Sequence, residues 1–298
     1  MRPFAAFALL VGVAGPAPAV ELADRLAPLL KAHRGRVAVA VKHLKTGVEF
    51  YHEADTPMPT ASLIKFPVLV EAYWQREEKK VAFDKVLTLK KEHRVPGSGV
   101  LTSHFSDGAT FPLRDAVRLM IAESDNTATN LVLEQTGIRP VNERMAKLGL
   151  TETRINAQVF RGSTTSVDPE RTKKYGLGST TAREMVKLLE MLQENKLVSP
   201  EACREMIAHL VACTDNEMFK RYLPPTVRLA HKTGAVNASR TEAGLMMLPS
   251  GPVALCVLTN ENADTRWAVD NAAQVLLANV AKAVHDHFAP PKKAAGRP

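Results

Sequence analysis

Segments with strand-like alternation lie near both ends of this chain, and the long stretch between them shows helical periodicity. Residues 36–44 alternate Val37, Val39 and Val41 with small and charged residues, and residues 47–52 repeat a shorter alternation. A period of two indicates strands that bury one face. Three further strand-like runs follow near the other end, at residues 227–232, 243–248 and 253–260.

Helical signals fill the region between the two strand groups. Residues 113–121 carry apolar side chains at helical spacing behind Pro112. A capping box at residues 181–184 and the Ser199-Pro200 pair mark the starts of two further helices. Terminal helices are expected at about residues 21–33 and 266–288.

This order of elements predicts an α/β (α+β) fold. Its simplest assembly is an antiparallel five-stranded sheet flanked by the terminal helices, with an all-helical lobe inserted in the sequence. We predict a single domain over residues 20–288, with the sheet lobe at about 20–60 and 213–288 and the helical lobe at about 61–212. A cleft between two such lobes is a natural ligand site.

The N-terminus resembles an export signal. Arg2 precedes a short apolar run at residues 4–13, and Ala17-Pro18-Ala19 provides a cleavage site, so residues 1–19 are predicted to be a signal peptide. The apolar run is too short to span a bilayer. We therefore expect an exported, periplasmic or extracellular protein without a transmembrane segment. The Pro- and Ala-rich residues 289–298 are expected to form a flexible tail.

Charge and composition argue against nucleic acid and against metal. The formal net charge is +8, and leaving out Arg2 of the leader and the three cations of the tail, Lys292, Lys293 and Arg297, reduces it to +4. Aromatic residues make up only 5% of the chain and do not interleave with basic ones, so nucleic-acid binding is not supported. The nine histidines form no His-Glu-x-x-His pattern, and we expect neither a metal nor a cofactor.

The three cysteines are an odd number. Cys256 lies in an apolar strand segment and is interpreted as a small buried hydrophobic residue. Cys203 and Cys213 are able to pair in an oxidising compartment, but their spacing does not establish that they do.

Three short motifs follow one another along the chain. They are Ser62-Leu63-Ile64-Lys65, Ser124-Asp125-Asn126 and Lys232-Thr233-Gly234. On a helix, Ser62 and Lys65 would project from one face, where a desolvated lysine is able to take the proton that makes the serine a nucleophile. A lysine and a threonine suit a substrate carboxylate, and a glycine lets the substrate backbone approach the strand edge. Each motif alone carries little weight, whereas the ordered triplet is a strong signal.

The motifs and their flanking residues resemble those of class A serine β-lactamases and penicillin-binding D,D-peptidases. The likeness includes residues 61–65, 120–130 and 231–234, and it extends over roughly residues 21–288. It implies that Ser62 forms an acyl-enzyme, that Lys65 is the base for acylation, and that Ser124 passes a proton to the leaving nitrogen.

The resemblance also implies a substrate-binding set. Asn126 would bind an amide carbonyl of the substrate, while Asp125 would hold its loop by hydrogen bonds. Lys232 and Thr233 would bind a carboxylate, and the N–H groups of Ala235 and Ser62 would form the oxyanion hole. Arg240 resembles an arginine that assists carboxylate binding in some relatives, although its offset from Lys232 is unusual. An exposed loop arginine is the alternative.

One element of the class A pattern is missing. Those enzymes carry a Glu-x-x-x-Asn element whose glutamate activates the water that releases the acyl group. Residues 151–181 contain no such element, and Glu170 is the only plausible substitute, with Asp168 a weaker one. Either Glu170 folds back over Ser62, or deacylation is slow or uses another base.

These observations predict an exported, monomeric serine hydrolase that forms an acyl-enzyme with β-lactams, most simply a class A-type β-lactamase. Two alternatives remain open. One is a D,D-peptidase or esterase acting on cell-wall peptide-like substrates, which the missing glutamate favours. The other is a binding protein that is acylated by β-lactams and does not release them.

Overall fold

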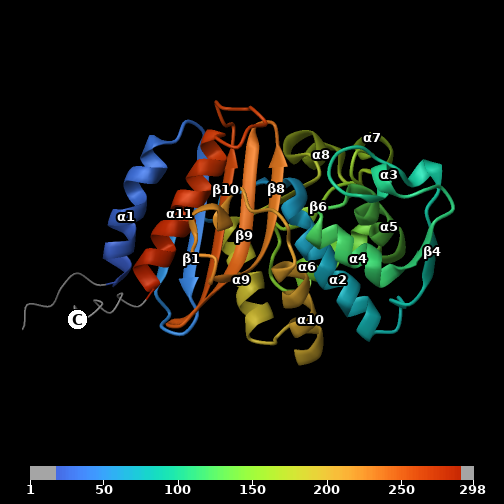
Figure 1. Ribbon diagram of the computed structural model, residues 1–298, viewed down its shortest axis with the longest axis horizontal. Coiled ribbons are helices and arrows are strands. Elements are labelled where there is room, and N and C mark those ends of the chain that lie inside the picture. The colour runs from blue at the N-terminus through green and yellow to red at the C-terminus, as the bar shows by residue number, and fades with distance from the viewer. Residues whose placement is uncertain (1–17, 290–298) are drawn as a thin grey trace, which may run out of the picture.

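A five-stranded antiparallel sheet forms the centre of the molecule, whose computed structural model describes residues 18–289 (Figure 1). The strand order is β2-β1-β10-β9-β8. The two N-terminal strands thus join the three C-terminal ones through pairing of β1 with β10, which sets Val39 opposite Val257. The predicted sheet is confirmed. Its strands are β1 (Arg36–His43), β2 (Glu49–His52), β8 (Arg228–Val236), β9 (Ser239–Leu248) and β10 (Gly251–Asn260).

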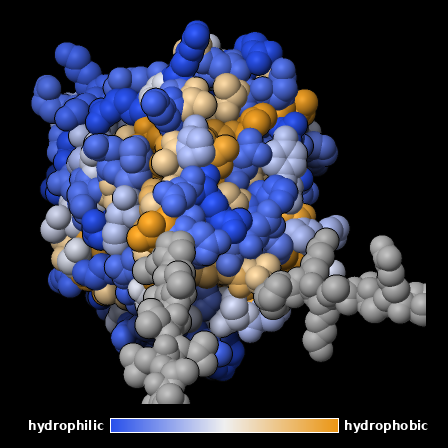
Figure 2. Space-filling model, turned by 90° about the vertical axis from the view of Figure 1, so that its left-hand side faces the viewer, coloured by the Kyte–Doolittle hydropathy of each residue, from blue (hydrophilic) through white to orange (hydrophobic). Residues whose placement is uncertain are grey.

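The alternation in β1 sorts its side chains between two cores. Val37, Val39 and Val41 pack with apolar residues of α1 (Pro18–Ala32) and α11 (Ala272–Phe288), which cover one face of the sheet (Figure 1). Ala38 and Ala40 belong instead to the core shared with the inserted helices. Each fully buried aliphatic side chain contributes roughly 1.5–3 kcal/mol, so both faces stabilise the sheet. The outer surface of the two terminal helices is mostly hydrophilic (Figure 2).

The insert packs against the other face and holds most of the helices, as predicted. They are α2 (Lys65–Glu77), α3 (Leu101–His104), α4 (Leu113–Ala122), α5 (Asn126–Thr136), α6 (Ile138–Lys147), α7 (Gly162–Thr165), α8 (Pro169–Tyr175), α9 (Ala182–Gln193) and α10 (Pro200–Val211), with short 3-10 turns η1 (Ala61–Ile64), η2 (Lys91–His93) and η3 (Phe219–Tyr222). The insert is not all-helical, however. It also contains β4 (Val86–Thr88) paired with β5 (Thr110–Pro112), and β6 (Arg154–Ile155) and β7 (Gly178–Thr180) in a small sheet with β3 (Met58–Pro59). Two- and three-residue strands are too short to show a period in the sequence.

Two predicted boundaries were wrong in a way that matters for the site. Strand β8 does not end at the Lys232-Thr233-Gly234 motif but continues to Val236. The last helix begins at Ala272 rather than near residue 266, because the Asn271 side chain accepts hydrogen bonds from Ala273 N and Gln274 N. A side chain that accepts from the first backbone N–H groups in this way favours a helix that begins at this point. Side-chain to backbone bonds also offer the preceding residues an alternative to helical hydrogen bonding. Residues 261–271 therefore form a loop.

The predicted helix starts at residues 181 and 199 are confirmed. At residue 181, however, the Glu184 carboxylate bonds to another partner than the capping box predicts. Ser199 Oγ accepts a hydrogen bond from Ala202 N at 3.3 Å. Thr181 Oγ1 accepts one from Glu184 N at 3.1 Å, but the Glu184 carboxylate turns away to Thr153 Oγ1 at 2.6 Å. Only half of the capping box forms, because a tertiary partner competes for the glutamate.

All three cysteines are free and buried in the structure. Cys203 Sγ donates a hydrogen bond to Leu197 O at 2.9 Å, so the pairing with Cys213 that the sequence left open does not occur here. The predicted signal peptide and tail lie outside the described residues, apart from residues 18, 19 and 289. Among the described residues, no helix combines the length and the apolar character needed to cross a membrane.

Candidate active site

Ser62 lies in a sharp turn between β3 and α2. The residue before it, Ala61, has a positive φ of 45°, a conformation that a non-glycine residue adopts only when its surroundings hold it there. Ser62 is half-buried and lines a cavity of about 1000 Å³. Ser124, Asn126, Thr233, Gly234 and Ala235 also line it. The structure thus brings six of the predicted site residues to one cavity.

Lys65 lies directly behind this cavity with its side chain fully buried. Its Nζ donates to Ser124 O at 2.6 Å, to Ser124 Oγ at 3.2 Å and to Asn126 Oδ1 at 2.8 Å. Burial lowers the pKa of Lys65 well below its usual value, and the nearby charge of Lys232 lowers it further. A buried lysine beside another cation favours its uncharged form, which is the form that accepts a proton.

The Ser124-Asp125-Asn126 motif is held in place by its aspartate. Ser124 has a positive φ of 52° in the short connection between α4 and α5. The Asp125 carboxylate caps α5 by accepting from Ala128 N at 2.8 Å, and it also accepts from Val100 N at 2.7 Å and Leu101 N at 2.8 Å. These bonds tie the motif to the segment that precedes α3, in the loop-holding role expected of Asp125.

Two glycines before α3 make that close packing possible. A Cβ atom on Gly99 would lie 2.2 Å from Asp125 Cγ, and one on Gly97 would lie 2.6 Å from Asn126 Nδ2. Both glycines also have positive φ, which L-residues with side chains rarely adopt. Sequence analysis did not identify this segment. The pair of glycines around Ser98 was the available signal.

Lys232 contacts the same hydroxyl as Lys65. Its Nζ, fully buried, donates to Ser124 Oγ at 3.0 Å and to Thr233 O at 2.9 Å. Burial lowers the pKa of Lys232 as well. Ser124 Oγ therefore lies between two lysine amines, at hydrogen-bonding distance from both, which is an arrangement suited to moving a proton.

Gly234 lines the cavity and also allows a close contact between two backbone segments. A Cβ atom here would lie 2.4 Å from Thr60 O and 2.8 Å from Leu63 N. The missing side chain therefore makes room for the backbone of η1. This contact joins strand β8, at the edge of the sheet beside the insert, to the turn that carries Ser62 (Figure 1).

A buried polar group next to Lys232 was missed by the sequence analysis. His231 Nδ1 lies 2.5 Å from Glu242 Oε1, both side chains are fully buried, and Glu242 Oε2 accepts from Phe219 N at 2.7 Å. Burial raises the pKa of Glu242 well above its usual range. Cys213 lies beside the ring; burial acts to raise its pKa, but His231 and Lys232 outweigh this and lower it. The available signal was a histidine and a glutamate, His231 inside one segment expected to be a strand and Glu242 directly before another.

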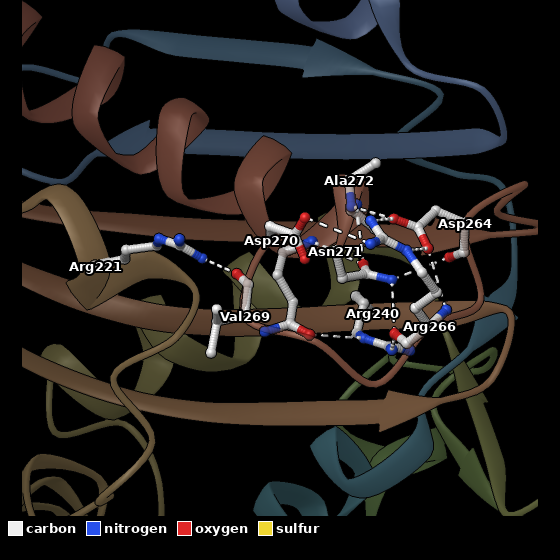
Figure 3. A network of polar contacts seen from close by, with 10 residues as sticks. Arg221, Arg240, Asp264, Arg266, Val269, Asp270, Asn271 and Ala272 are labelled. Carbon is white, nitrogen blue, oxygen red and sulfur yellow. Dashed lines mark hydrogen bonds and ion pairs between the residues drawn. The ribbon is translucent and has the colours of Figure 1, made fainter.

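Arg240 is not placed to bind a substrate carboxylate. Its side chain is 1% exposed and lies outside the cavity lining. The guanidinium donates to the carbonyl oxygens of Val236, Ser239 and Arg266 and, through Nε, to Gln274 Oε1. Figure 3 shows Asp264, Arg266 and Asn271 gathered around it. Arg240 instead holds the 261–271 loop against β9 through its hydrogen bond to Arg266 O.

Glu170 is also outside the site. It is exposed in the first turn of α8, while Asp168 caps that helix by accepting from Arg171 N at 3.0 Å. The loop wall of the cavity consists of Ala157, Gln158, Val159 and Phe160, none of them acidic. Asn130 fixes this wall through two hydrogen bonds with Val159. Its Oδ1 accepts from Val159 N at 2.8 Å, and its Nδ2 donates to Val159 O at 3.1 Å. One of the two alternatives required Glu170 to fold back over Ser62, and the loop does not place it there.

Comparisons with known proteins agree with this geometry. The family model described as "Beta-lactamase enzyme family" matches residues 21–288. A β-lactamase of Bacteroides uniformis is 25% identical over 281 residues, which are 89% of this chain and 90% of that protein. The crystal structure of a β-lactamase from Sphaerobacter thermophilus superposes with a TM-score of 0.79 at 26% identity, over 91% of this chain and 99% of that one.

The solved structure of PBP-A shares the fold, with a TM-score of 0.77 at 22% identity over 90% of this chain and 95% of that one. The family-model match covers nearly the whole chain, and the sheet, the insert and the ordered motifs are those expected from it. The chain belongs to the β-lactamase enzyme family, within the wider group of β-lactamase-like and penicillin-binding serine hydrolases.

Proposed function

We propose that this enzyme forms an acyl-enzyme on Ser62 with β-lactams and hydrolyses it slowly. The observation that carries the proposal is the meeting of two buried lysines at one hydroxyl. Ser124 Oγ lies 3.2 Å from Lys65 Nζ and 3.0 Å from Lys232 Nζ, beside the cavity that Ser62 lines. This arrangement supplies a base, a proton route and a cation for an anionic substrate.

Acylation begins with Lys65 in its uncharged form. Lys65 takes the proton of the Ser62 hydroxyl as Ser62 Oγ bonds to the β-lactam carbonyl carbon. The N–H groups of Ser62 and Ala235 stabilise the oxyanion. When the carbon–nitrogen bond breaks, Ser124 gives its proton to the leaving nitrogen and regains one from Lys65. Lys65 is then uncharged again, and the proton of Ser62 has moved to the product.

Substrate binding relies on groups at the Lys232 end of β8. The ammonium of Lys232 and the hydroxyl of Thr233 bind the substrate carboxylate, and Asn126 orients the amide on the acyl side. Asn126 is held for this by Lys65 Nζ and by its own bond to Pro96 O at 2.9 Å. A buried cation without a bonded carboxylate is well placed to attract an anion, because little water screens it.

Deacylation is the slow step in this proposal. Release of the acyl group needs a base that activates water, and neither Glu170 nor any acidic residue of the loop wall lies in the cavity lining. Lys65, uncharged again after acylation, is the base that we assign to this slow step. The same observation favours a second candidate, a D,D-peptidase or penicillin-binding enzyme that β-lactams acylate and that acts on peptides ending in a carboxylate.

The test is hydrolysis of a chromogenic cephalosporin by wild type and by Ser62→Ala. A burst close to one equivalent of enzyme, followed by slower turnover that Ser62→Ala abolishes, supports slow β-lactam hydrolysis. A burst without turnover supports the penicillin-binding candidate, which is then assayed on a peptide ending in D-Ala-D-Ala. If the wild type shows neither a burst nor turnover, the proposed function is refuted.

We further propose that the enzyme is exported through its N-terminal leader and acts as a monomer. The support is the order of charge, apolar run and Ala-x-Ala site in residues 1–19. Cleavage after Ala19 predicts that the secreted protein begins at Val20, which N-terminal sequencing of exported material tests.

A further inference from the structure

One acidic side chain belongs to the wall of the substrate cavity. Among the described residues that line this cavity, Asp215 is the only one with a charged side chain. It is half-buried and comes from the segment that joins α10 to η3. The acylation steps and the carboxylate binding proposed above do not use it, so they leave its place in the cavity unexplained.

Contacts on both sides of Asp215 hold this segment. Thr214 N and Thr214 Oγ1 both donate to Ala122 O, at 3.0 Å each. Further along, Phe219 N donates to the buried carboxylate of β9 at 2.7 Å. Asp215 Oδ1 accepts from Glu217 N at 2.9 Å, which is the only hydrogen bond that its carboxylate forms with the described residues. The negative charge is therefore fixed in place, and Oδ2 is free to meet a substrate.

This charge lies at the carboxylate end of the cavity. The helix that precedes the segment, α10, packs against β8, the strand of Lys232 and Thr233. Burial lowers the pKa of Lys232, and the negative charge of Asp215 counteracts part of that effect. Because such an interaction weakens with distance, the carboxylate and the ammonium are near neighbours. A cation and an anion thus lie close together where the substrate carboxylate is expected.

A neighbouring cation and anion suit a zwitterionic part of a substrate. In a cephalosporin, the ring carbon next to the one that bears the carboxylate carries a variable substituent. A carboxylate bound at Lys232 therefore brings that substituent toward Asp215. A positive charge on the substituent would be attracted to Asp215, while the carboxylate keeps its own contact with Lys232.

We propose that Asp215 is a specificity-determining residue that binds a cationic substituent next to the substrate carboxylate. The inference rests on the proposed function and names a preferred substrate class, which is zwitterionic β-lactams. For unit charges about 6 Å apart, an effective dielectric constant of about 40 to 80 gives a preference of about threefold to tenfold.

The test compares cephaloridine with cephalothin. Both carry the thienylacetamido side chain and the carboxylate, and they differ in the 3-substituent, which is a pyridiniummethyl group in cephaloridine and a neutral acetoxymethyl group in cephalothin. The second-order rate constant for acylation is measured by competition with a chromogenic cephalosporin, so that turnover is not required. The ratio of the two constants is compared between variants and wild type, so effects on the shared carboxylate cancel.

Asp215→Asn and Asp215→Ser should each lower the ratio of cephaloridine to cephalothin by about threefold to tenfold. Asp215→Glu, which keeps the charge, should stay within about twofold of wild type. Glu217→Gln is the matched control, because it removes an equal charge from an exposed residue of the same segment that does not line the cavity. It should also stay within about twofold. Thermal unfolding of each variant checks that the fold is kept.

The outcomes separate the specificity role of Asp215 from the proposed function. A ratio that both neutral variants leave within twofold of wild type overturns the role of Asp215 alone. A ratio that falls as far in Asp215→Glu or in Glu217→Gln overturns it as well, because the effect then does not depend on a charge at this position. A wild type that neither cephalosporin acylates overturns the proposed function together with this inference.

Discussion

The contact between Gly234 and the turn of Ser62 makes a sharp prediction for Gly234→Ala. The added Cβ atom would lie 2.4 Å from Thr60 O, where ordinary contacts begin near 3.4 Å, and 2.8 Å from Leu63 N. Both neighbours are backbone atoms, so relief requires β8 and η1 to separate by about 1 Å. Overpacking of this kind costs about 1–3 kcal/mol.

The same movement should impair the reaction more than the fold. Ser62 and Ala235 lie on the two sides of the contact, and a displacement of about 1 Å in a reacting geometry lowers the rate by up to roughly 10²-fold. We expect the acylation rate constant to fall by about this factor. The melting temperature should fall by only roughly 2–10 °C, which leaves the variant folded at 25 °C.

Gly47→Ala is the control that separates the effect of backbone strain at a glycine from the effect of displacing β8 from η1. Gly47 has a positive φ of 73° in the turn between β1 and β2, and no atom lies within 4 Å of its added Cβ. This variant should lose about 1 kcal/mol of stability, with no change in acylation. Stopped-flow acylation and thermal unfolding of both variants test the reasoning. A Gly234→Ala enzyme that acylates within twofold of wild type would refute it.

Four further predictions concern residues in and around the site. The lowered pKa of Lys65 means that the acylation rate falls as pH drops through that pKa; Lys65→Met should lower the rate by roughly 10²–10⁴-fold, measured as a pH–rate profile. At pH values between the lowered pKa of Lys65 in the folded state and its ordinary value of 10.5, the unfolded chain binds one more proton than the folded one, so the free energy of unfolding rises with pH. Urea unfolding at a series of pH values should show this slope only when Lys65 is present. Glu170→Gln should leave burst and steady-state rates within twofold, because the side chain is exposed outside the cavity; a tenfold fall in turnover would restore it as the deacylating base. Arg240→Met should lower the free energy of unfolding by roughly 2–4 kcal/mol because buried carbonyl oxygens lose their donor; a raised KM with unchanged stability would instead indicate a carboxylate ligand.

Local patterns were enough to predict the sheet, whereas most of the site residues were assigned through resemblance to a family. The alternation around Val39 and the short apolar run at residues 253–260 both indicate strands, and in the structure these two segments pair with each other. Ser62 and Lys65 are neighbours in the chain, so their proximity follows from a short helical turn. Ser124 and Lys232 joined them through resemblance rather than through any local rule.

The failures have a common physical origin. Arg240 was assigned to the substrate carboxylate through the resemblance, but a side chain's direction depends on what packs against the strand. Arg240 turns to the 261–271 loop. Glu170 belongs to a loop whose path depends on distant partners, such as Asn130 with Val159. None of these contacts is local in sequence.

The central claim is that Ser62 becomes acylated, and mass spectrometry tests it most directly. Intact protein mixed with benzylpenicillin should gain the mass of one penicillin within the burst, and peptide mapping should place the adduct on Ser62. The adduct should decline slowly, and Ser62→Ala should show none. An adduct on another residue, or wild type that hydrolyses benzylpenicillin without ever carrying an adduct, would contradict the account.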